Sequence, residues 1–351
     1  MATFEIDGRS IGRGKPPFVI AELSANHNND LERAKRICDA AASAGASALK
    51  LQTYTADSIT LDSDREDFHI KNGPWAGRTL YDLYTEAATP WDWHETLFNH
   101  CRKLGLTVFS SPFDPKSVDF LDELGVPAFK IASFELVDIP LIRHVASKGK
   151  PIIMSTGMAN PAEIEDAVSI ARKAGCESLG LLYCISGYPA PVSDANISTI
   201  ADLKARFDVE VGLSDHTPGI GVAPAAIALG ATMLEKHLTL SRADGGADAE
   251  FSLEPSEFSA LVESVNQAAE ALGTVKYGNK ASEAGNLRFR RSLYAVEDIK
   301  KGDGLTSANV RSIRPAFGLA PKYYDEVLTS TAARDIQRGE PLAWDMLNQP
   351  C

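Results

Sequence analysis

The chain has 351 residues, of which 44% are hydrophobic and 23% charged, and its formal net charge is -12. This composition is typical of a globular protein and excludes a largely disordered chain. The acidic balance argues against nucleic acid as a partner, although a local group of lysines can still bind a small anion. No apolar run approaches the roughly 20 residues that a membrane helix needs, and no signal-peptide pattern opens the chain, so we expect a cytoplasmic protein with no membrane partner.

Short apolar runs alternate with helical patterns over about 270 residues, which is the size of a (β/α)8 TIM barrel in the α/β class. A doubly wound open sheet also alternates, but it usually has a glycine-rich turn after its first strand. This chain has Glu22-Leu23-Ser24-Ala25-Asn26-His27 there, which favours the barrel. The predicted strands are residues 18–23, 48–51, 106–110, 128–132, 151–155, 179–183, 209–213 and 231–234, and the predicted helices are 30–44, 91–104, 115–124, 139–147, 161–174, 197–207, 219–229 and 255–272.

The pattern changes after Gly273. Residues 276–288 are typical of a linker, and residues 289–351 contain short strand-like pieces and a repeated phrase, at 298–302 and again at 335–339. We therefore expect a barrel domain at 1–275, a linker at 276–288 and a small β-rich domain at 289–351. A domain of about 60 residues buries little surface by itself, so we expect it to pack against a partner.

Two histidines follow the last two predicted strands, at the end of a barrel where active sites lie. His216 and His237 come just after strands whose ends are neighbours in a parallel sheet. Neutral imidazoles that converge can bind a divalent metal. Two isolated histidines can equally be polar caps of their strands, but the charged neighbours Asp215, Glu235 and Lys236 favour a site.

Two lysines stand inside apolar strands, Lys50 in Ala-Leu-Lys-Leu and Lys130 in Phe-Lys-Ile. Burying an unpaired ammonium group is costly, so these lysines need a partner. With the hydroxyl groups at neighbouring strand ends they suit a small anion that carries phosphate or carboxylate. Two alternatives remain: each lysine forms a buried ion pair with Glu22 or Glu135, or one of them forms a Schiff base in a metal-free aldolase.

An irregular stretch at residues 54–89 is too long for a simple connection, and long loops are often functional. Its aromatic residues, and those that follow, can line a sugar pocket, but such side chains more often fill a core beneath a long loop. They are Trp75, Tyr81, Tyr84, Trp91 and Trp93.

Seven motifs, in this order along the chain, resemble the sialic acid synthase family, which condenses phosphoenolpyruvate with an amino sugar to make nine-carbon 2-keto acids. They are residues 22–27, 49–53, 111–114, 130–133, 155–158, 212–217 and 235–237. The C-terminal region resembles the SAF (antifreeze-like) domain of that family, with Ile313-Arg314-Pro315 as its marker. Four further segments are most similar to pseudaminic acid synthases, which use 2,4-diacetamido-2,4,6-trideoxy-L-altrose: residues 51–57, 77–84, 241–246 and 321–325.

The resemblance implies roles for individual residues on the metal and phosphoenolpyruvate side of the site. His216 and His237 would bind a divalent metal, Mn2+ first and Mg2+ or Co2+ as alternatives, and Glu22 would hold a water on that metal. Phosphate would leave by C–O cleavage. The residues that would bind phosphoenolpyruvate are Lys50, Ser111, Lys130, Ser133, Ser155, Ser186 and Ser214.

On the sugar side, the resemblance implies that Gln52, Tyr188 and Asp248 face the substrate. Arg314 would reach the sugar from the SAF domain of the other subunit, which makes a domain-swapped homodimer the expected assembly. N-acetylneuraminate or legionaminate synthesis is the alternative within the family, and a non-catalytic sugar-binding barrel is the alternative outside enzymes.

The chain departs from the family pattern at three positions. Ser111 and Ser186 stand where some relatives have Thr and Asn, and both remain polar. Ile185 replaces a small polar residue. The contacts of these three residues are therefore the ones that the resemblance predicts least well.

Overall fold

The computed structural model describes residues 4–348. The chain forms two compact units, one ending at Gly273 and one beginning at Thr274. Within residues 4–348, no helix combines the length and the apolar character needed to span a membrane.

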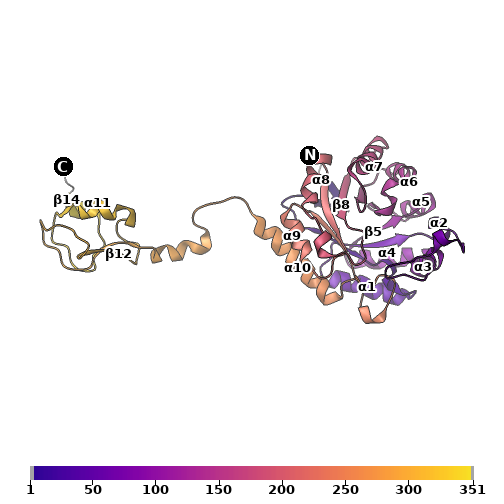
Figure 1. Cartoon of the computed structure of the whole chain (residues 1–351), viewed down its shortest axis with the longest axis horizontal. Coiled ribbons are helices and arrows are strands. Elements are labelled where there is room, and N and C mark those ends of the chain that lie inside the picture. Colours follow the sequence, from indigo (N-terminus) through magenta and orange to yellow (C-terminus); the bar gives the residue numbers. More distant parts are fainter. Residues whose placement is uncertain (1–3, 349–351) are drawn as a thin grey trace. The chain divides into compact units, whose positions relative to one another are not determined.

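In the first unit, eight parallel strands close into a barrel, and helices surround it (Figure 1). Strands that are consecutive in the chain pair side by side, and the last pairs with the first, so the predicted TIM barrel is confirmed. The barrel strands are β3 (Phe18–Glu22), β4 (Ala48–Thr53), β5 (Thr107–Pro112), β6 (Phe129–Ile131), β7 (Ile152–Ser155), β8 (Leu179–Cys184), β9 (Glu210–Asp215) and β10 (Met233–His237).

A helix follows each barrel strand and returns the chain to the start of the next. Polar side chains begin several of these helices: Asp30 accepts hydrogen bonds from the backbone amides of Glu32 and Arg33, as predicted for an N-cap. The helices are α1 (Leu31–Ser43), α4 (His94–Lys103), α5 (Pro115–Glu123), α6 (Ile139–Ala146), α7 (Pro161–Lys173), α8 (Thr199–Phe207), α9 (Val222–Ala228) and α10 (Pro255–Leu272), with α2 (Ala56–Ile59) and α3 (Leu80–Ala87) between β4 and α4.

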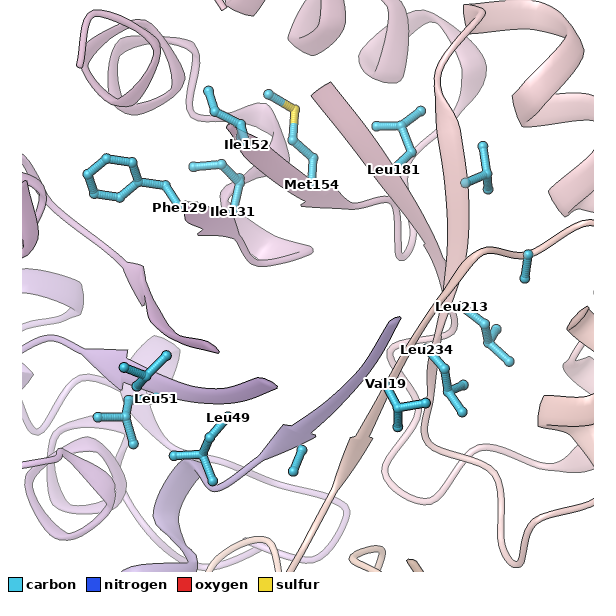
Figure 2. Packing of buried hydrophobic residues seen from close by; sticks show 14 of the residues in the cluster. Val19, Leu49, Leu51, Phe129, Ile131, Ile152, Met154, Leu181, Leu213 and Leu234 are labelled. Carbon is cyan, nitrogen blue, oxygen red and sulfur yellow. The ribbon is translucent and has the colours of Figure 1, made fainter. Parts of the chain in front are cut away.

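Side chains alternate between the two faces of each barrel strand. Those that face outward, such as Leu49, Leu51 and Leu234, pack beneath the helices (Figure 2). Those that face inward are apolar toward the amino ends of the strands and form a second cluster with residues of the N-terminus. The members of that cluster are Phe4, Ile6, Ile11, Phe18, Ile20, Ala48, Phe109, Ala128, Ile153, Leu182 and Met233.

A β-hairpin that the sequence patterns did not predict contributes to this second cluster. Its strands, β1 (Phe4–Ile6) and β2 (Arg9–Ile11), pair antiparallel. Asp7 and Gly8 join them with positive φ angles of 54° and 72°, as a two-residue hairpin turn requires. The Asp-Gly dipeptide was the available signal, but strands of three residues are too short for periodicity to reveal.

In the second unit, β11 (Ser292–Ala295) pairs with β12 (Val310–Ile313), and β13 (Thr331–Ala332) pairs with β14 (Leu347–Asn348). A short helix, α11 (Tyr324–Leu328), completes this β-rich SAF fold. Residues that were expected in a linker partly form a 3-10 helix, Ala281–Phe289.

The repeated phrase pairs with itself at the centre of this unit. Ile299 and Ile336 exchange backbone hydrogen bonds of 2.8 and 2.9 Å. The carboxylate of Asp335 accepts from the amide of Lys301, and that of Asp298 accepts from the amide of Arg338. The two copies therefore serve as equivalent halves of one small core.

We expect Phe4→Ala to lower the free energy of unfolding by about 3–5 kcal/mol, because it empties a buried position against the barrel interior. Glu5→Ala is the matched control, since Glu5 is the exposed residue of the same strand. Urea unfolding followed by circular dichroism measures both. Equal midpoints for the two variants would show that the hairpin does not stabilise the barrel.

Candidate active site

Polar residues replace apolar ones at the inward positions near the carboxyl ends of the strands. Every candidate residue except Arg314 lies at this carboxyl-terminal end of the barrel. The inward residues of the barrel strands here are Glu22, Lys50, Gln52, Ser111, Lys130, Ser155, Ser214, Glu235 and His237, and Ser133, Ser186, Tyr188, His216 and Asp248 lie in the loops that follow.

Two lysines and two glutamates form a buried charge quartet inside the barrel, defined by Glu22, Lys50, Lys130 and Glu235. Lys50 makes an ion pair with Glu22, and its Nζ lies 3.9 Å from Glu235 Oε1. Lys130 Nζ donates to both carboxylate oxygens of Glu235, at 3.1 and 3.2 Å. All four side chains are at most 5% exposed, so water does not screen these charges.

The quartet explains why lysines are tolerated within apolar strands. Lys50 has the ion pair with Glu22 that was considered from sequence, whereas Lys130 pairs with Glu235 and not with Glu135. From sequence Glu235 was only a charged neighbour that favoured a site, and no role was predicted for it. Its position two residues before His237, on the same face of the strand, was the signal that marks it.

The two carboxyl groups of the quartet have opposite electrostatic environments. Burial raises the pKa of Glu22 to about 7, although the Lys50 ammonium acts against this. Burial also opposes ionisation of Glu235, but Lys130 and Lys50 outweigh it and lower that pKa to about 2. Ser214 Oγ donates a further hydrogen bond of 3.1 Å to Glu235. Glu22 is thus the member of the quartet that exchanges a proton most easily near neutral pH.

The pKa values of the two lysines are also shifted in opposite directions. Burial lowers the pKa of Lys50, but Glu22 and Glu235 outweigh it, and the net shift is upward. Burial dominates at Lys130, whose pKa is lowered. Both ammonium groups face the barrel interior, so an anion that enters meets two lysines whose present counter-ions are glutamates.

A cradle of hydroxyl groups, formed by Ser133, Ser155 and Ser186 around Gly157, adjoins the quartet. The Gly157 amide donates to Ser133 Oγ at 3.1 Å. A Cβ at position 157 would overlap the hydroxyls of Ser186 and Ser133, so only glycine allows their approach. The buried Ser155 Oγ has no hydrogen-bond partner within the described residues. On the opposite side, Lys50 Nζ donates to Ser111 Oγ at 3.3 Å. The unpartnered hydroxyl of Ser155, with the other hydroxyls and the two lysines nearby, suits a phosphate or carboxylate group.

His216 and His237 lie together at the mouth of the barrel, with ring centroids 5.3 Å apart. His216 Nδ1 is 3.0 Å from the carbonyl oxygen of Ile185, which orients the ring and leaves Nε2 without a proton in the neutral form. Because the backbone of Ile185 makes this contact, the unusual side chain at that position does not disturb it. His237 Nδ1 is buried and has no hydrogen-bond partner in the described part of the chain; Asp248 Oδ2 lies 3.6 Å away.

The two imidazoles have pKa shifts of opposite sign. Burial lowers the pKa of His237 well below its usual value, and His216 and the nearby lysines act in the same direction. At His216 burial is outweighed by the thiol of Cys184 and the carbonyl of Ile185, so its pKa is raised.

A buried clamp holds the loop that carries His216. Lys236 Nζ, on the outward face of β10, donates to Asp215 Oδ2 at 2.8 Å and to the Thr217 carbonyl at 2.5 Å. Asp215 Oδ1 accepts from the amide and the hydroxyl of Thr217 at 2.9 and 2.7 Å. The residues on both sides of His216 are therefore tied to the strand that ends in His237.

Tyr188 and Asp248, which the resemblance places at the sugar, lie beside the histidines. The Tyr188 ring is 4.6 Å from His216, and the Ser24 hydroxyl donates to Asp248. Gln52 is half-buried on β4, two residues beyond Lys50 and on the same face. Arg314 is exposed at the end of β12 in the second unit.

Comparisons with known proteins agree with this architecture. Residues 37–277 match the NeuB family, and residues 290–348 match the SAF domain. The pseudaminic acid synthase of Campylobacter jejuni subsp. jejuni serotype O:2 is 46% identical over 328 residues, which cover 93% of this chain and 96% of that protein.

Two further relatives make different products. The N,N'-diacetyllegionaminic acid synthase of the same Campylobacter strain is 36% identical over 330 residues, covering 93% of this chain and 98% of that protein. The crystal structure of N-acetylneuraminic acid synthetase from Leptospira borgpetersenii has a TM-score of 0.72 and 34% identity, covering 82% of this chain and 96% of that one.

We expect Gly157→Ala to weaken binding of phosphoenolpyruvate at least about tenfold, because the added Cβ displaces the cradle hydroxyls. Gly221→Ala is the control, since a Cβ there meets nothing within 4 Å. Isothermal titration gives the dissociation constant for each variant. Unchanged affinity in Gly157→Ala would remove the cradle from the anion site.

The raised pKa of Glu22 predicts that the stability of the protein depends on pH. Its pKa is about 7 in the native protein against 4.5 for an ordinary glutamate, so between about pH 5 and 7 the native state holds a proton that the unfolded chain releases. The free energy of unfolding of the native protein should therefore fall as pH rises through this range. Glu22→Gln removes this part of the pH dependence, whereas Glu5→Gln, on the exposed face of β1, retains it. A constant difference in urea unfolding between the native protein and Glu22→Gln at pH 5 and 7 contradicts the assignment.

Proposed function

The chain belongs to the NeuB family, and we propose that it joins phosphoenolpyruvate to 2,4-diacetamido-2,4,6-trideoxy-L-altrose, giving pseudaminic acid and phosphate. Its relatives support condensation of phosphoenolpyruvate with an amino sugar. The choice of sugar is supported by the identity of 46% to a pseudaminic acid synthase, against 36% to the legionaminic acid synthase of the same strain. Phosphoenolpyruvate is an intracellular metabolite, so the proposal also implies a cytoplasmic enzyme.

The observation that carries the proposal is the charge quartet beside the hydroxyl cradle. Phosphoenolpyruvate carries a phosphate and a carboxylate on the same carbon, C2, and the site offers two buried ammonium groups and several hydroxyls within one end of the barrel. In the free protein Glu22 and Glu235 balance the lysines. The entering trianion adds negative charge, and Glu22, with a pKa of about 7, is the group that can take up a proton in response.

The two histidines fit a divalent metal, with Mn2+ as the first expectation and Mg2+ or Co2+ as alternatives. His216 Nε2 is available because Nδ1 is engaged, and His237 Nδ1 is a buried atom without a partner in the described residues. No group of three or more His, Cys, Asp or Glu side chains within residues 4–348 is arranged for a metal. Substrate and water would therefore supply the remaining ligands. When bound, the ion would supply Lewis acidity toward the sugar aldehyde.

The side chains of the site have distinct tasks in the proposed reaction. C3 of phosphoenolpyruvate forms a bond to the aldehyde carbon, the carbonyl electron pair moves to the aldehyde oxygen, and that oxygen receives the proton that Glu22 took up on binding. Lys50 and Lys130 hold the phosphate and carboxylate and offset their charge. Water then adds at C2, and Glu22, ionised by that proton transfer, accepts the proton that this water loses. The bond between C2 and the phosphate oxygen then breaks, and phosphate leaves with that electron pair and with the proton of the C2 hydroxyl, which leaves the 2-keto acid.

The mouth of the barrel supports the proposal of a domain-swapped homodimer. Four large apolar side chains on its loops are strongly exposed: Phe134 (59%), Val137 (59%), Met158 (64%) and Val192 (57%). Monomeric proteins seldom leave such a group uncovered around a polar site. We propose that a SAF domain of the second copy covers it and that the partner subunit's Arg314 reaches the sugar.

Phosphate release from phosphoenolpyruvate tests the proposed function. The purified protein is assayed with the diacetamido altrose sugar, with the diacetamido sugar of legionaminate synthesis and with N-acetylmannosamine. Release with the altrose sugar alone supports the proposal. Release with another sugar retains the reaction and changes the substrate, and release with none, in folded and metal-loaded protein, overturns it.

The metal proposal has its own test. We expect His237→Ala to raise the dissociation constant for Mn2+ at least about tenfold and to abolish turnover, because it removes one of two protein ligands. EDTA should abolish turnover of the native protein, and added Mn2+ should restore it. His100→Ala is the control, since His100 pairs with Asp39 on the outer helices. Native Mn2+ affinity and turnover in His237→Ala would refute the assignment.

A further inference from the structure

A hairpin-like excursion between α2 and α3 ends beside the proposed sugar site. Within it His69 bridges to Thr79, and the chain between Ile70 and Arg78 is closed by backbone hydrogen bonds of 2.9 Å. The tip of this excursion is exposed at Lys71, Asn72, Gly73, Pro74, Ala76 and Gly77. Trp75 differs from them, because its side chain is half-buried and turned toward the barrel.

Trp75 joins two other loops of the barrel mouth. Its indole Nε1 donates to the carbonyl of Ala247 at 2.8 Å. Its ring lies 5.8 Å from the ring of Tyr188, which in turn is 4.6 Å from His216. Ala247 directly precedes Asp248, so Trp75 contacts the backbone next to one residue expected at the sugar and the ring of another.

These contacts extend an aromatic wall from the histidines to the rim of the site. Phe251 completes it, with ring distances of 5.1 Å to Tyr188 and 5.0 Å to His237. The quartet and the cradle, which lie next to this wall, are charged and polar. The two substrates of the proposed reaction differ in the same way. Phosphoenolpyruvate is an anion, whereas the amino sugar carries a methyl group at C6 and acetamido methyl groups.

We propose that Trp75 is a specificity-determining residue that closes the sugar site and packs its indole face against the deoxygenated C6 end of the amino sugar. This inference rests on the proposed function. The N–H is already bonded to Ala247, so the exposed part of the indole offers no hydrogen bond to a hydroxyl group. A hydroxyl placed against that face loses its hydrogen bonds to water without replacement, whereas a methyl group does not. The wall therefore favours 6-deoxy sugars over their 6-hydroxy counterparts.

The test compares two sugars that differ only at C6: the 2,4-diacetamido-2,4,6-trideoxy altrose and its 6-hydroxy analogue. We expect Trp75→Ala to lower kcat/KM for the trideoxy sugar about 10- to 100-fold and to change that for the 6-hydroxy sugar much less. The KM for phosphoenolpyruvate should stay within about twofold. Trp75→Phe keeps an apolar ring and should preserve most of the selectivity, and Asn72→Ala, at the exposed tip, should leave it unchanged.

An equal fall for both sugars, or a parallel rise in the KM for phosphoenolpyruvate, would overturn the proposal. A measurement that needs no sugar distinguishes failure of the Trp75 proposal from failure of the proposed function. Trypsin can cleave the excursion at Arg65, Lys71 and Arg78, and we expect faster cleavage there in Trp75→Ala than in Asn72→Ala. If the native protein turns over neither altrose sugar but another amino sugar, the C6 comparison is made with that sugar. Unchanged cleavage in Trp75→Ala contradicts closure by Trp75 whatever the substrate.

Discussion

The buried charge quartet is the constraint on which the rest of the site depends. Two ammonium groups cannot stay ionised inside a barrel unless carboxylates balance them, and Glu22 and Glu235 do so from neighbouring strands. The balance is unequal, because Glu235 contacts both lysines whereas Glu22 contacts one. The structure therefore holds one firmly ionised carboxylate and one carboxyl group near its titration point. An anionic substrate can exploit that difference by sharing the lysines while Glu22 takes up a proton.

The fold produces this arrangement by simple alternation along each strand. On β10, for example, Met233, Glu235 and His237 face inward at three successive levels, from the apolar interior through the quartet to the mouth. The unpredicted hairpin adds apolar side chains to the lowest level. Lys236, between two of these residues, faces outward and ties the loop of His216 to the same strand. One strand thus contributes to the core, the anion site and the histidine pair.

Much of this was predictable from sequence, and the exceptions have physical reasons. Strand–helix periodicity predicts the barrel, and polar residues at strand ends predict which side chains meet. The partner of Lys130 was missed because β6 and β10 are not neighbours in the sheet: Lys130 and Glu235 meet across the barrel interior, and periodicity along the chain does not give contacts of that kind. Trp75 was recognised only as one aromatic among several, since nothing in a loop sequence says which side chain turns inward. The roles of the site residues and of the metal stay predictions.

Proton uptake on binding of phosphoenolpyruvate tests the central role of the quartet most directly. Isothermal titration at pH 8, in two buffers with different ionisation enthalpies, gives the number of protons bound with the ligand. At this pH the phosphate of the free ligand is fully ionised, so the protein must supply the site of protonation. We expect net uptake by the native protein, because the added charge raises the pKa of Glu22 above its value of about 7. Glu22→Gln should take up fewer protons. Equal proton numbers for the two proteins would contradict the account.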